Sequence, residues 1–378
     1  MNKRLMIIAG EASGDLHGAS LIKELKRLDP SLSITGIGGD KMEAAGMEII
    51  YHIKKMAFLG FVEIIRHIPF IKKVQKDIIG KIKTENIGTV VLIDYPGFNL
   101  SLAKKLKQLG KKIIYYISPQ VWAWGKGRIK TIKALTDKML VVFPFEEKLY
   151  KDNGVDAVYV GHPLLEHMEN YHFISKNELF DKYKLDRNKP ILLVLPGSRK
   201  QEIKKIFPQS ISASVKLAKD FNMQVVVACA ENIDPNIFYR FTNEKDFTII
   251  KGNTYDLLKH SHFGIIKSGT STLEAGVFQL PFIVVYATST LTYLIGRLLV
   301  SIKNIAMANI ILGEDVVEEL IQHDVNSANI YSTTSKYLLD DNLYNSLKNK
   351  LGLIKNKLGK VGASKFAAGL IYEQLNEA

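Results

Sequence analysis

The sequence predicts an α/β protein with two doubly wound, Rossmann-like domains that face a cleft. Short apolar runs rich in β-branched residues alternate with amphipathic helical segments, which is typical of parallel sheets covered on both faces. This alternation pauses around Gly161-His162-Pro163, and a second series of strands begins at Ile191. A length of 378 residues is enough for two hydrophobic cores of ordinary size.

The alternation also gives the order of the elements. In the first half we expect strands over residues 5–9, 33–37, 89–93, 111–117 and 138–143, and helices over 16–28, 100–109 and 121–135. In the second half we expect strands over 191–195, 224–228, 247–250, 263–266 and 282–286, and helices over 200–219, 341–358 and 365–377. The corresponding domains are 1–165 and 166–340, followed by C-terminal helices over 341–378.

Composition narrows the class of protein. The single cysteine, Cys229, excludes internal disulfides and Cys-based metal clusters and fits a reducing compartment. The apolar run at the N-terminus is too short for a signal peptide, and the apolar stretch 277–300 is interrupted by Pro281 and Arg297. We therefore expect a cytoplasmic protein.

The net charge of +13 is compatible with several partners. Lysines scattered over helix faces would account for it through solubility alone. Because the sequence contains no nucleic-acid-binding module, we expect no nucleic-acid partner and rank anionic lipid and phosphate above it.

One stretch, residues 265–274, has the pattern of a strand, a turn and the start of a helix. Small hydroxyl residues and a glycine form the turn: Ser268, Gly269, Thr270 and Ser271. A helix N-terminus placed here presents unpaired N–H groups to a phosphate, and Gly269 lets the ligand approach the backbone. Glu274 falls close to the first helical turn. A capped turn without a ligand fits the same residues.

Two charged residues stand where strands are expected to end. Asp94 follows the apolar run 90–93, and Arg199 follows a strand in Leu195-Pro196-Gly197-Ser198-Arg199. Since ligands bind at the carboxyl ends of parallel strands, Asp94 is a candidate general base and Arg199 a candidate phosphate ligand. Alternatively, Asp94 bonds only to its own turn and Arg199 is only solvated.

Cofactor signatures are missing from the sequence. Gly10-Glu11-Ala12-Ser13-Gly14-Asp15 contains glycines but is neither a dinucleotide-binding fingerprint nor a P-loop. An Asp-x-Asp motif does not occur. We expect no cofactor and no catalytic metal.

The apolar segment 56–71 is flanked by four lysines: Lys54, Lys55, Lys72 and Lys73. Its apolar residues spread around most of a helical circumference. The segment is either a helix buried between layers or an element that dips into an anionic bilayer surface. The candidate membrane-facing residues are Phe58, Phe61, Val62, Ile65 and Ile68.

Seven motifs, in order along the chain, together resemble the lipid-A-disaccharide synthases. They are Gly10-Glu11-Ala12-Ser13-Gly14-Asp15, Ile93-Asp94-Tyr95-Pro96-Gly97-Phe98-Asn99, Ser118-Pro119-Gln120-Val121-Trp122-Ala123-Trp124, Phe143-Pro144-Phe145-Glu146, Gly161-His162-Pro163, Leu195-Pro196-Gly197-Ser198-Arg199 and Ser268-Gly269-Thr270. The Trp-Ala-Trp run is the most specific of them, although these tryptophans also suit a core position. The resemblance extends from the first strand to the last helices.

This resemblance implies a GT-B type glycosyltransferase that works without a cofactor at the cytoplasmic face of the inner membrane. Enzymes of the family transfer 2,3-diacylglucosamine from its UDP conjugate to the 6-hydroxyl of 2,3-diacylglucosamine 1-phosphate. The products are UDP and a β-1,6-linked disaccharide 1-phosphate, on the pathway to lipopolysaccharide. The resemblance also implies C-terminal helices that pack back on the N-terminal domain, or are exchanged within a homodimer.

The resemblance further implies roles for individual residues. Asp94 matches the essential aspartate and Arg199 the essential arginine. Contacts with substrate or nucleotide are expected from Ser13, Asp15, Trp124, Ser198, Arg199, Ser268, Gly269, Thr270, Ser271, Glu274 and Asn309. Some relatives carry a second acidic residue where this chain has Gly97, so that carboxylate is not required here.

Two other classes of function fit part of the sequence. Another UDP-sugar enzyme of the same fold, such as a muramyl-type transferase or a UDP-N-acetylglucosamine 2-epimerase, would share the phosphate-binding features. It would not account for the Trp-Ala-Trp run or the apolar segment. A non-catalytic lipid-binding or scaffold protein would account for the charge and the apolar segment, but it would not need Asp94 and Arg199.

Overall fold

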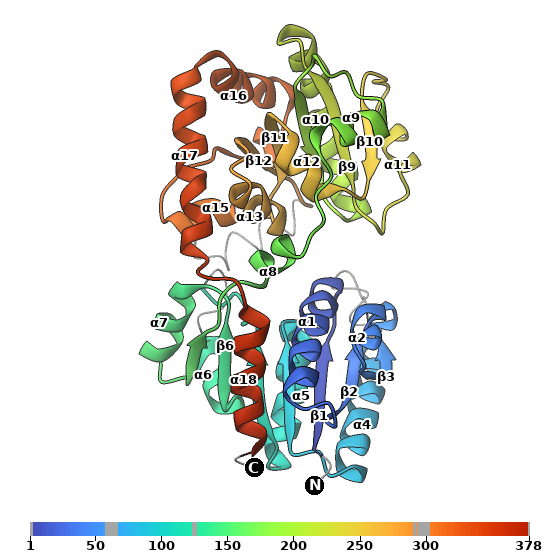
Figure 1. Cartoon of the computed structure of the whole chain (residues 1–378), viewed down its shortest axis with the longest axis vertical. Helices are drawn as coiled ribbons and strands as arrows, with labels where there is room; N and C mark the ends of the chain where they lie inside the picture. The colour runs from blue at the N-terminus through green and yellow to red at the C-terminus, as the bar shows by residue number, and fades with distance from the viewer. Residues whose placement is uncertain (1–2, 57–66, 123–126, 290–292, 294–302, 377–378) are drawn as a thin grey trace. The chain divides into compact units, whose positions relative to one another are not determined.

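The computed structural model describes residues 3–56, 67–122, 127–289, 293 and 303–376 (Figure 1). The chain divides into two compact units. The first comprises residues 1–166 and 358–378, and the second comprises residues 167–357. Each has its own parallel sheet, as the alternation of strands and helices predicts.

The described part of the first unit contains a sheet of seven parallel strands in the order β3-β2-β1-β4-β5-β6-β7. The strands are β1 (Arg4–Ala9), β2 (Ser33–Gly38), β3 (Glu48–His52), β4 (Thr89–Ile93), β5 (Lys112–Tyr116), β6 (Lys138–Val141) and β7 (Ala157–Tyr159). The helices are α1 (Ala12–Leu28), α2 (Asp40–Ala44), α4 (Ile68–Thr84), α5 (Pro96–Gln108), α6 (Arg128–Leu135), α7 (Pro144–Asp152), α18 (Ala363–Asn376) and α8 (Pro163–Glu169), which crosses the boundary between the units.

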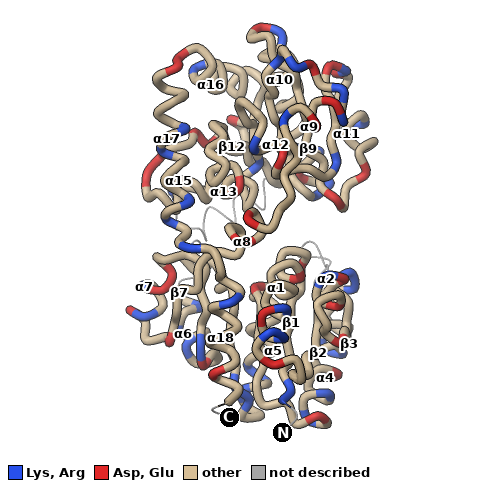
Figure 2. Tube along the Cα trace, viewed as in Figure 1, with Lys and Arg blue, Asp and Glu red and all other residues tan. Residues whose placement is uncertain are grey.

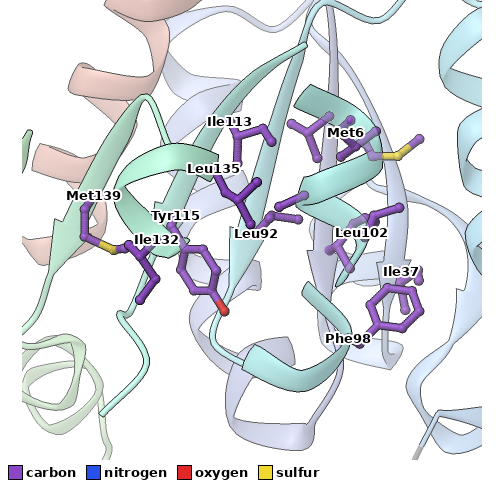
Figure 3. Close-up of a cluster of buried hydrophobic side chains, with 14 of the residues drawn as sticks. Met6, Ile37, Leu92, Phe98, Leu102, Ile113, Tyr115, Ile132, Leu135 and Met139 are labelled. Carbon is purple, nitrogen blue, oxygen red and sulfur yellow. The ribbon is translucent and has the colours of Figure 1, made fainter. Parts of the chain in front are cut away.

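Side chains alternate between the two faces of this sheet. Met6 and Leu92 belong to a buried cluster that includes Leu102 of α5 and Ile132 of α6, part of which is drawn in Figure 3. On the other face, Ala9 and Ile93 lie against α1, because a side chain at Gly14 would meet them. The sheet is therefore covered on both faces, which explains why its central strands β1 and β4 are buried along almost their whole length.

The described part of the second unit contains a sheet of six parallel strands in the order β10-β9-β8-β11-β12-β13. The strands are β8 (Ile191–Leu195), β9 (Gln224–Cys229), β10 (Thr248–Lys251), β11 (Phe263–Lys267), β12 (Phe282–Tyr286) and β13 (Glu319–Ile321). The helices are α9 (Lys176–Tyr183), α10 (Lys200–Asp220), α11 (Asn236–Tyr239), α12 (Thr254–His260), α13 (Thr270–Val277), α15 (Met307–Leu312), α16 (Ser327–Leu339) and α17 (Asp341–Lys357).

Strand order reverses once in each sheet. From β1 the chain builds outward through β2 and β3, then returns to place β4 on the other side of β1. The second unit repeats this plan, with β8 as the first strand and β11 on its opposite side. Crossover connections leave in opposite directions at such a switch point, so the carboxyl ends of the two strands open onto a crevice.

The two C-terminal helices belong to different units. Helix α17 packs against α13, α15 and α16 of the second unit. Only α18, at the red end of the colour scale in Figure 1, packs beside α1 in the first unit. Ala367, Ala368 and Ile371 are fully buried on α18, and the two alanines allow close approach of α18 to α1.

The helix expected over residues 121–135 is shorter in the structure. It begins at Arg128, and residues 121 and 122 form a turn after β5. The strand expected over 138–143 ends at Val141, because Phe143 caps helix α7.

Charged side chains are found on both units. Figure 2 shows lysine and arginine distributed over the elements of both units and interspersed with acidic residues. Among the helices that the structure describes, we find none with the length and apolar character needed to cross a bilayer.

Candidate active site

A cavity of about 370 Å³ lies in the second unit, where β8 and β11 end. It is lined by Leu195, Gly197, Ser198, Arg199, Glu202, Ala228, Ala230, Thr254, Lys267, Ser268, Gly269, Thr270, Ser271 and Glu274. Seven residues predicted from the sequence are in this lining: Ser198, Arg199, Ser268, Gly269, Thr270, Ser271 and Glu274. The switch point of the sheet thus brings together two motifs that are distant in sequence.

Two glycines shape the turns of this cavity. Gly269 has a φ of +148° and stands immediately before α13, and Gly197 has a φ of +114° after β8. A Cβ on Gly197 would lie 2.6 Å from a carboxylate oxygen of Glu202, so the turn needs glycine for space as well as conformation. The first N–H groups of α13 have no acceptor within the helix and are suited to an anion.

Two hydroxyl groups in the turn before α13 donate hydrogen bonds to backbone carbonyls of the protein itself. Ser268 donates to the carbonyl of Ile305 at 2.8 Å, and Ser271 donates to the carbonyl of Lys267 at 3.0 Å. These bonds fix the turn, and the Ser268 N–H donates to the carbonyl of Val285 at 3.1 Å, so the N–H groups of Thr270 and Ser271 at the start of α13 are the donors suited to a ligand. Thr270 is exposed at the start of α13.

Three charged side chains meet on one side of the cavity. The Nζ atom of Lys267 lies 2.9 Å from a carboxylate oxygen of Glu202, and Nη1 of Arg199 lies 3.7 Å from the same oxygen. The side chain of Arg199 is 53% exposed, whereas those of Lys267 and Glu202 are 18% and 17% exposed. Our sequence interpretation identified Arg199 and missed the other two. The signal for Lys267 is its place as the last residue of a buried strand, directly before the Ser-Gly-Thr turn.

Glu274 lies on α13 with its carboxyl group in a largely apolar setting. Burial raises the pKa of Glu274 to about 7, and the Tyr255 hydroxyl donates to it at 3.5 Å, which lowers the pKa in part. A carboxyl group held in this way is a suitable partner for ligand hydroxyls.

Asn309 does not line the cavity. Its side-chain amide donates to the carbonyl of Val317 and to Glu319, both at 2.9 Å, and its oxygen accepts from the N–H groups of Val316 and Val317 at 2.8 Å. The side chain is buried and joins α15 to the segment before β13. In this structure Asn309 therefore supports the fold of the second unit.

Asp94 stands at the switch point of the first unit, directly after β4. Asp94 and Tyr95 have φ values of +42° and +47°, a conformation that is strained for residues with a side chain. The hydroxyl of Tyr115 and the side-chain amide of Asn99 donate to the carbonyl of Asp94 at 2.5 and 2.7 Å. The Asp94 N–H in turn donates to the carbonyl of Tyr116 at 3.1 Å. The backbone is thus held in place from both sides.

The environment of Asp94 favours its neutral form. Burial and, to a smaller extent, the negative charge of Glu11 raise the pKa of Asp94 from 3.8 to about 6, against a lowering contribution from the Tyr95 N–H. Glu11 follows β1, the neighbouring strand across the switch point. A carboxyl group with a pKa near 6 can accept a proton at neutral pH more effectively than an ordinary aspartate.

Asp15 and Ser13 differ in their surroundings. The Asp15 carboxylate is buried and accepts from the N–H groups of Gly39, Lys41 and Met42 at 2.7, 3.2 and 3.0 Å. It therefore joins α1 to the start of α2. Ser13 is exposed in the first turn of α1.

Five of the predicted residues lie outside the described part of the chain: Trp124, Phe58, Phe61, Val62 and Ile65. Ile68, the first residue of α4, is 41% exposed.

A buried carboxylate, Glu146, joins the turns that follow β5 and β6. It accepts hydrogen bonds from the Ser118 hydroxyl at 2.8 Å, the Trp122 indole N–H at 3.0 Å and the Phe143 N–H at 3.2 Å. Burial raises the pKa of Glu146 to about 7 even though these three donors lower it. Trp122 thus holds the turn that leads toward Trp124, a role that the sequence alone left undecided.

Within the part of the chain that the structure describes, we find no group of three or more His, Cys, Asp or Glu side chains that could hold a metal ion.

Glu146 is expected to make stability depend on pH. Its pKa is 4.5 when unfolded and about 7 when folded, so the folded chain binds the extra proton between these values. Stability therefore falls as pH rises from about 4.5 to 7, by roughly 3 kcal/mol from this group, and is level above. Glu146→Gln should remove this contribution, measured by urea unfolding at pH 5 and pH 8. Glu147→Gln is the matched control, and an equal pH dependence in wild type and Glu146→Gln would contradict the assignment.

Comparison with known proteins finds one family that matches the sequence and several solved structures with the same architecture. The family model described as lipid-A-disaccharide synthetase matches residues 5–365. A lipid-A-disaccharide synthase of Geobacter metallireducens is 40% identical over 382 residues, which covers 100% of this chain and 98% of that protein.

Solved structures share the fold at low sequence identity. The S. aureus MnaA structure with UDP has a TM-score of 0.69 at 16% identity. The alignment covers 100% of this chain and 98% of the MnaA chain. The calicheamicin glycosyltransferase CalG4 has a TM-score of 0.65 at 12% identity, with coverage of 100% and 99%. These structural similarities show that the chain has the GT-B type fold. The sequence match shows which family with that fold it belongs to. The chain belongs to the lipid-A-disaccharide synthetase family.

Proposed function

We propose that this glycosyltransferase condenses UDP-2,3-diacylglucosamine with 2,3-diacylglucosamine 1-phosphate to give UDP and the β-1,6-linked lipid A disaccharide 1-phosphate. The observation that carries the proposal is the cavity at the switch point of the second unit, where Arg199 and the start of α13 meet. Family membership supports the choice of substrates over those of another UDP-sugar enzyme of the same fold.

The second unit supplies the interactions that a departing UDP needs. As the bond between the anomeric carbon and the diphosphate oxygen breaks, negative charge develops on UDP. Arg199 and the N–H groups of Thr270 and Ser271 would stabilise that charge. Glu274, whose carboxyl lines the same cavity, would bond to the ribose hydroxyls.

Asp94 supplies the base for the attacking hydroxyl. The 6-hydroxyl of the acceptor forms the new bond to the anomeric carbon in a single inverting displacement, and its proton passes to the Asp94 carboxylate. The raised pKa of Asp94 matches this task, because the base is ionised at neutral pH and still accepts a proton readily.

Asp94→Asn is expected to abolish turnover and to retain nucleotide binding. The amide keeps the shape of the side chain but cannot accept the proton, so acceptor-dependent UDP release should fall by about 10²-fold or more. The measurement is UDP release from UDP-2,3-diacylglucosamine with and without the acceptor, together with calorimetric titration of UDP. Near-normal release by Asp94→Asn would show that another group is the base.

Glu11→Gln should move the acid limb of the pH–rate profile. In wild type, kcat/KM should fall about tenfold per pH unit below pH 6, because the protonated Asp94 is inactive as a base. Since the Glu11 charge raises the pKa of Asp94, its removal should shift this limb to lower pH. Glu24→Gln, further along α1, is the matched control. A limb that stays in place in Glu11→Gln would disprove the coupling.

Membrane association is the second part of the proposal. Both substrates carry acyl chains, and the apolar segment 56–71 is flanked by the exposed Lys54, Lys55, Lys72 and Lys73. We infer that this segment enters the cytoplasmic face of the inner membrane while the lysines meet anionic head groups. A homodimer belongs to the same proposal, since the contact of α18 with α1 could equally be made by the α18 helix of a second copy.

Phe61→Ser combined with Ile65→Ser is expected to reduce sedimentation with vesicles that contain anionic lipid. The two substitutions remove apolar area that would otherwise enter the bilayer. Leu339→Ser with Leu353→Ser, at exposed positions 76% and 50% accessible in the second unit, is the control for a general loss of apolar surface. Unchanged sedimentation of the first double variant, with folding verified by thermal unfolding, would rule out this role for the segment.

A further inference from the structure

Lys267 is a cation inside the cavity, and the proposed reaction assigns it no role. It is the last residue of β11 and only 18% exposed, and its ammonium group lies beside the turn before α13. A Cβ built on Gly269 would lie 3.6 Å from Nζ of Lys267. The ammonium therefore stands next to the backbone that leads into the first N–H groups of α13, on the same wall of the cavity.

Glu202 holds Lys267 and Arg199 at the same time. A single carboxylate oxygen lies 2.9 Å from the Lys267 ammonium and 3.7 Å from the Arg199 guanidinium. The other oxygen packs against the turn at Gly197, where a Cβ would be only 2.6 Å away. The carboxylate thus stands between two cations in a site suited to an anion.

We propose that Lys267 is a second diphosphate-binding cation, and that Glu202 is the resident counter-ion that Lys267 exchanges for a phosphate oxygen. This inference rests on the proposed function, since it assigns a role within the nucleotide cavity. A partly buried ammonium needs an anionic partner, and Glu202 provides one while the cavity is empty. A diphosphate brings more negative charge than one carboxylate, and therefore competes for both cations.

A purely structural role for the pair leads to different results. If the Lys267–Glu202 pair served only to hold β11 against α10, its loss would weaken binding of every ligand of the cavity alike. A phosphate contact, in contrast, affects UDP and leaves uridine almost unchanged. The number of phosphates on the ligand therefore separates the two roles.

The experiment is calorimetric titration of the full-length protein with UDP, UMP and uridine. Lys267→Met removes the charge and keeps the length of the side chain, Lys267→Arg restores a cation, and Lys219→Met at the exposed far end of α10 is the control. We expect Lys267→Met to weaken UDP binding roughly 10- to 100-fold, with less than a twofold change for uridine, and Lys267→Arg to recover most of the affinity. Equal UDP binding by wild type and Lys267→Met, or an equal loss for uridine, would overturn the assignment.

Glu202→Gln tests the exchange itself. Removing the competing carboxylate should tighten UDP binding by about three- to tenfold, because the cations are then freed for phosphate. Weaker UDP binding by Glu202→Gln would overturn the counter-ion role. Wild-type protein that binds neither UDP nor UMP would instead overturn the proposed function of the cavity, so the two failures are distinguishable. Thermal unfolding of each variant verifies that it is folded.

Discussion

The parallel arrangement of the strands is the constraint on which both units depend. Parallel strands all end at the same edge of a sheet, and only the switch point leaves that edge free of crossing connections. In the first unit the turns at the switch point carry Glu11 and Asp94, and in the second they carry Arg199 and Lys267. The fold therefore determines where chemistry is possible, and the turn residues determine which chemistry it is.

Burial acts on two carboxyl groups of the first unit with different consequences. Glu146 is surrounded by three hydrogen-bond donors, so its carboxyl group holds two turns together. Asp94 is instead opposed by the charge of Glu11, and its backbone, rather than its carboxyl, receives the Tyr115 and Asn99 bonds. A raised pKa alone does not identify a functional residue; the location of the hydrogen bonds separates a structural carboxyl from a reactive one.

Local sequence patterns predicted the layers, the main strands and half of the residues that line the cavity, because apolar periodicity and turn residues are local signals. The short edge strands β3, β7 and β13 were missed, since each contains an apolar run of only two or three residues, most of them only partly buried. The roles of Asp15 and Asn309 were also beyond reach, because their partners are backbone groups of other elements. Lys267 was overlooked for a similar reason: it ends strand β11 whereas its partner Glu202 lies on helix α10, and only the folded sheet brings them together.

The different exposure of Arg199 and Lys267 gives the two cations different physical roles. Arg199 is more than half exposed, so solvent and salt weaken its attraction for a bound anion, but it is accessible to an approaching one. Lys267 is largely screened from water, where an ion pair is stronger and removal of its partner is more costly. An anion that contacts only Arg199 leaves the Lys267–Glu202 pair intact, whereas one that reaches Lys267 must replace Glu202. Because that replacement requires charge at two positions, the arrangement favours a diphosphate over a monophosphate.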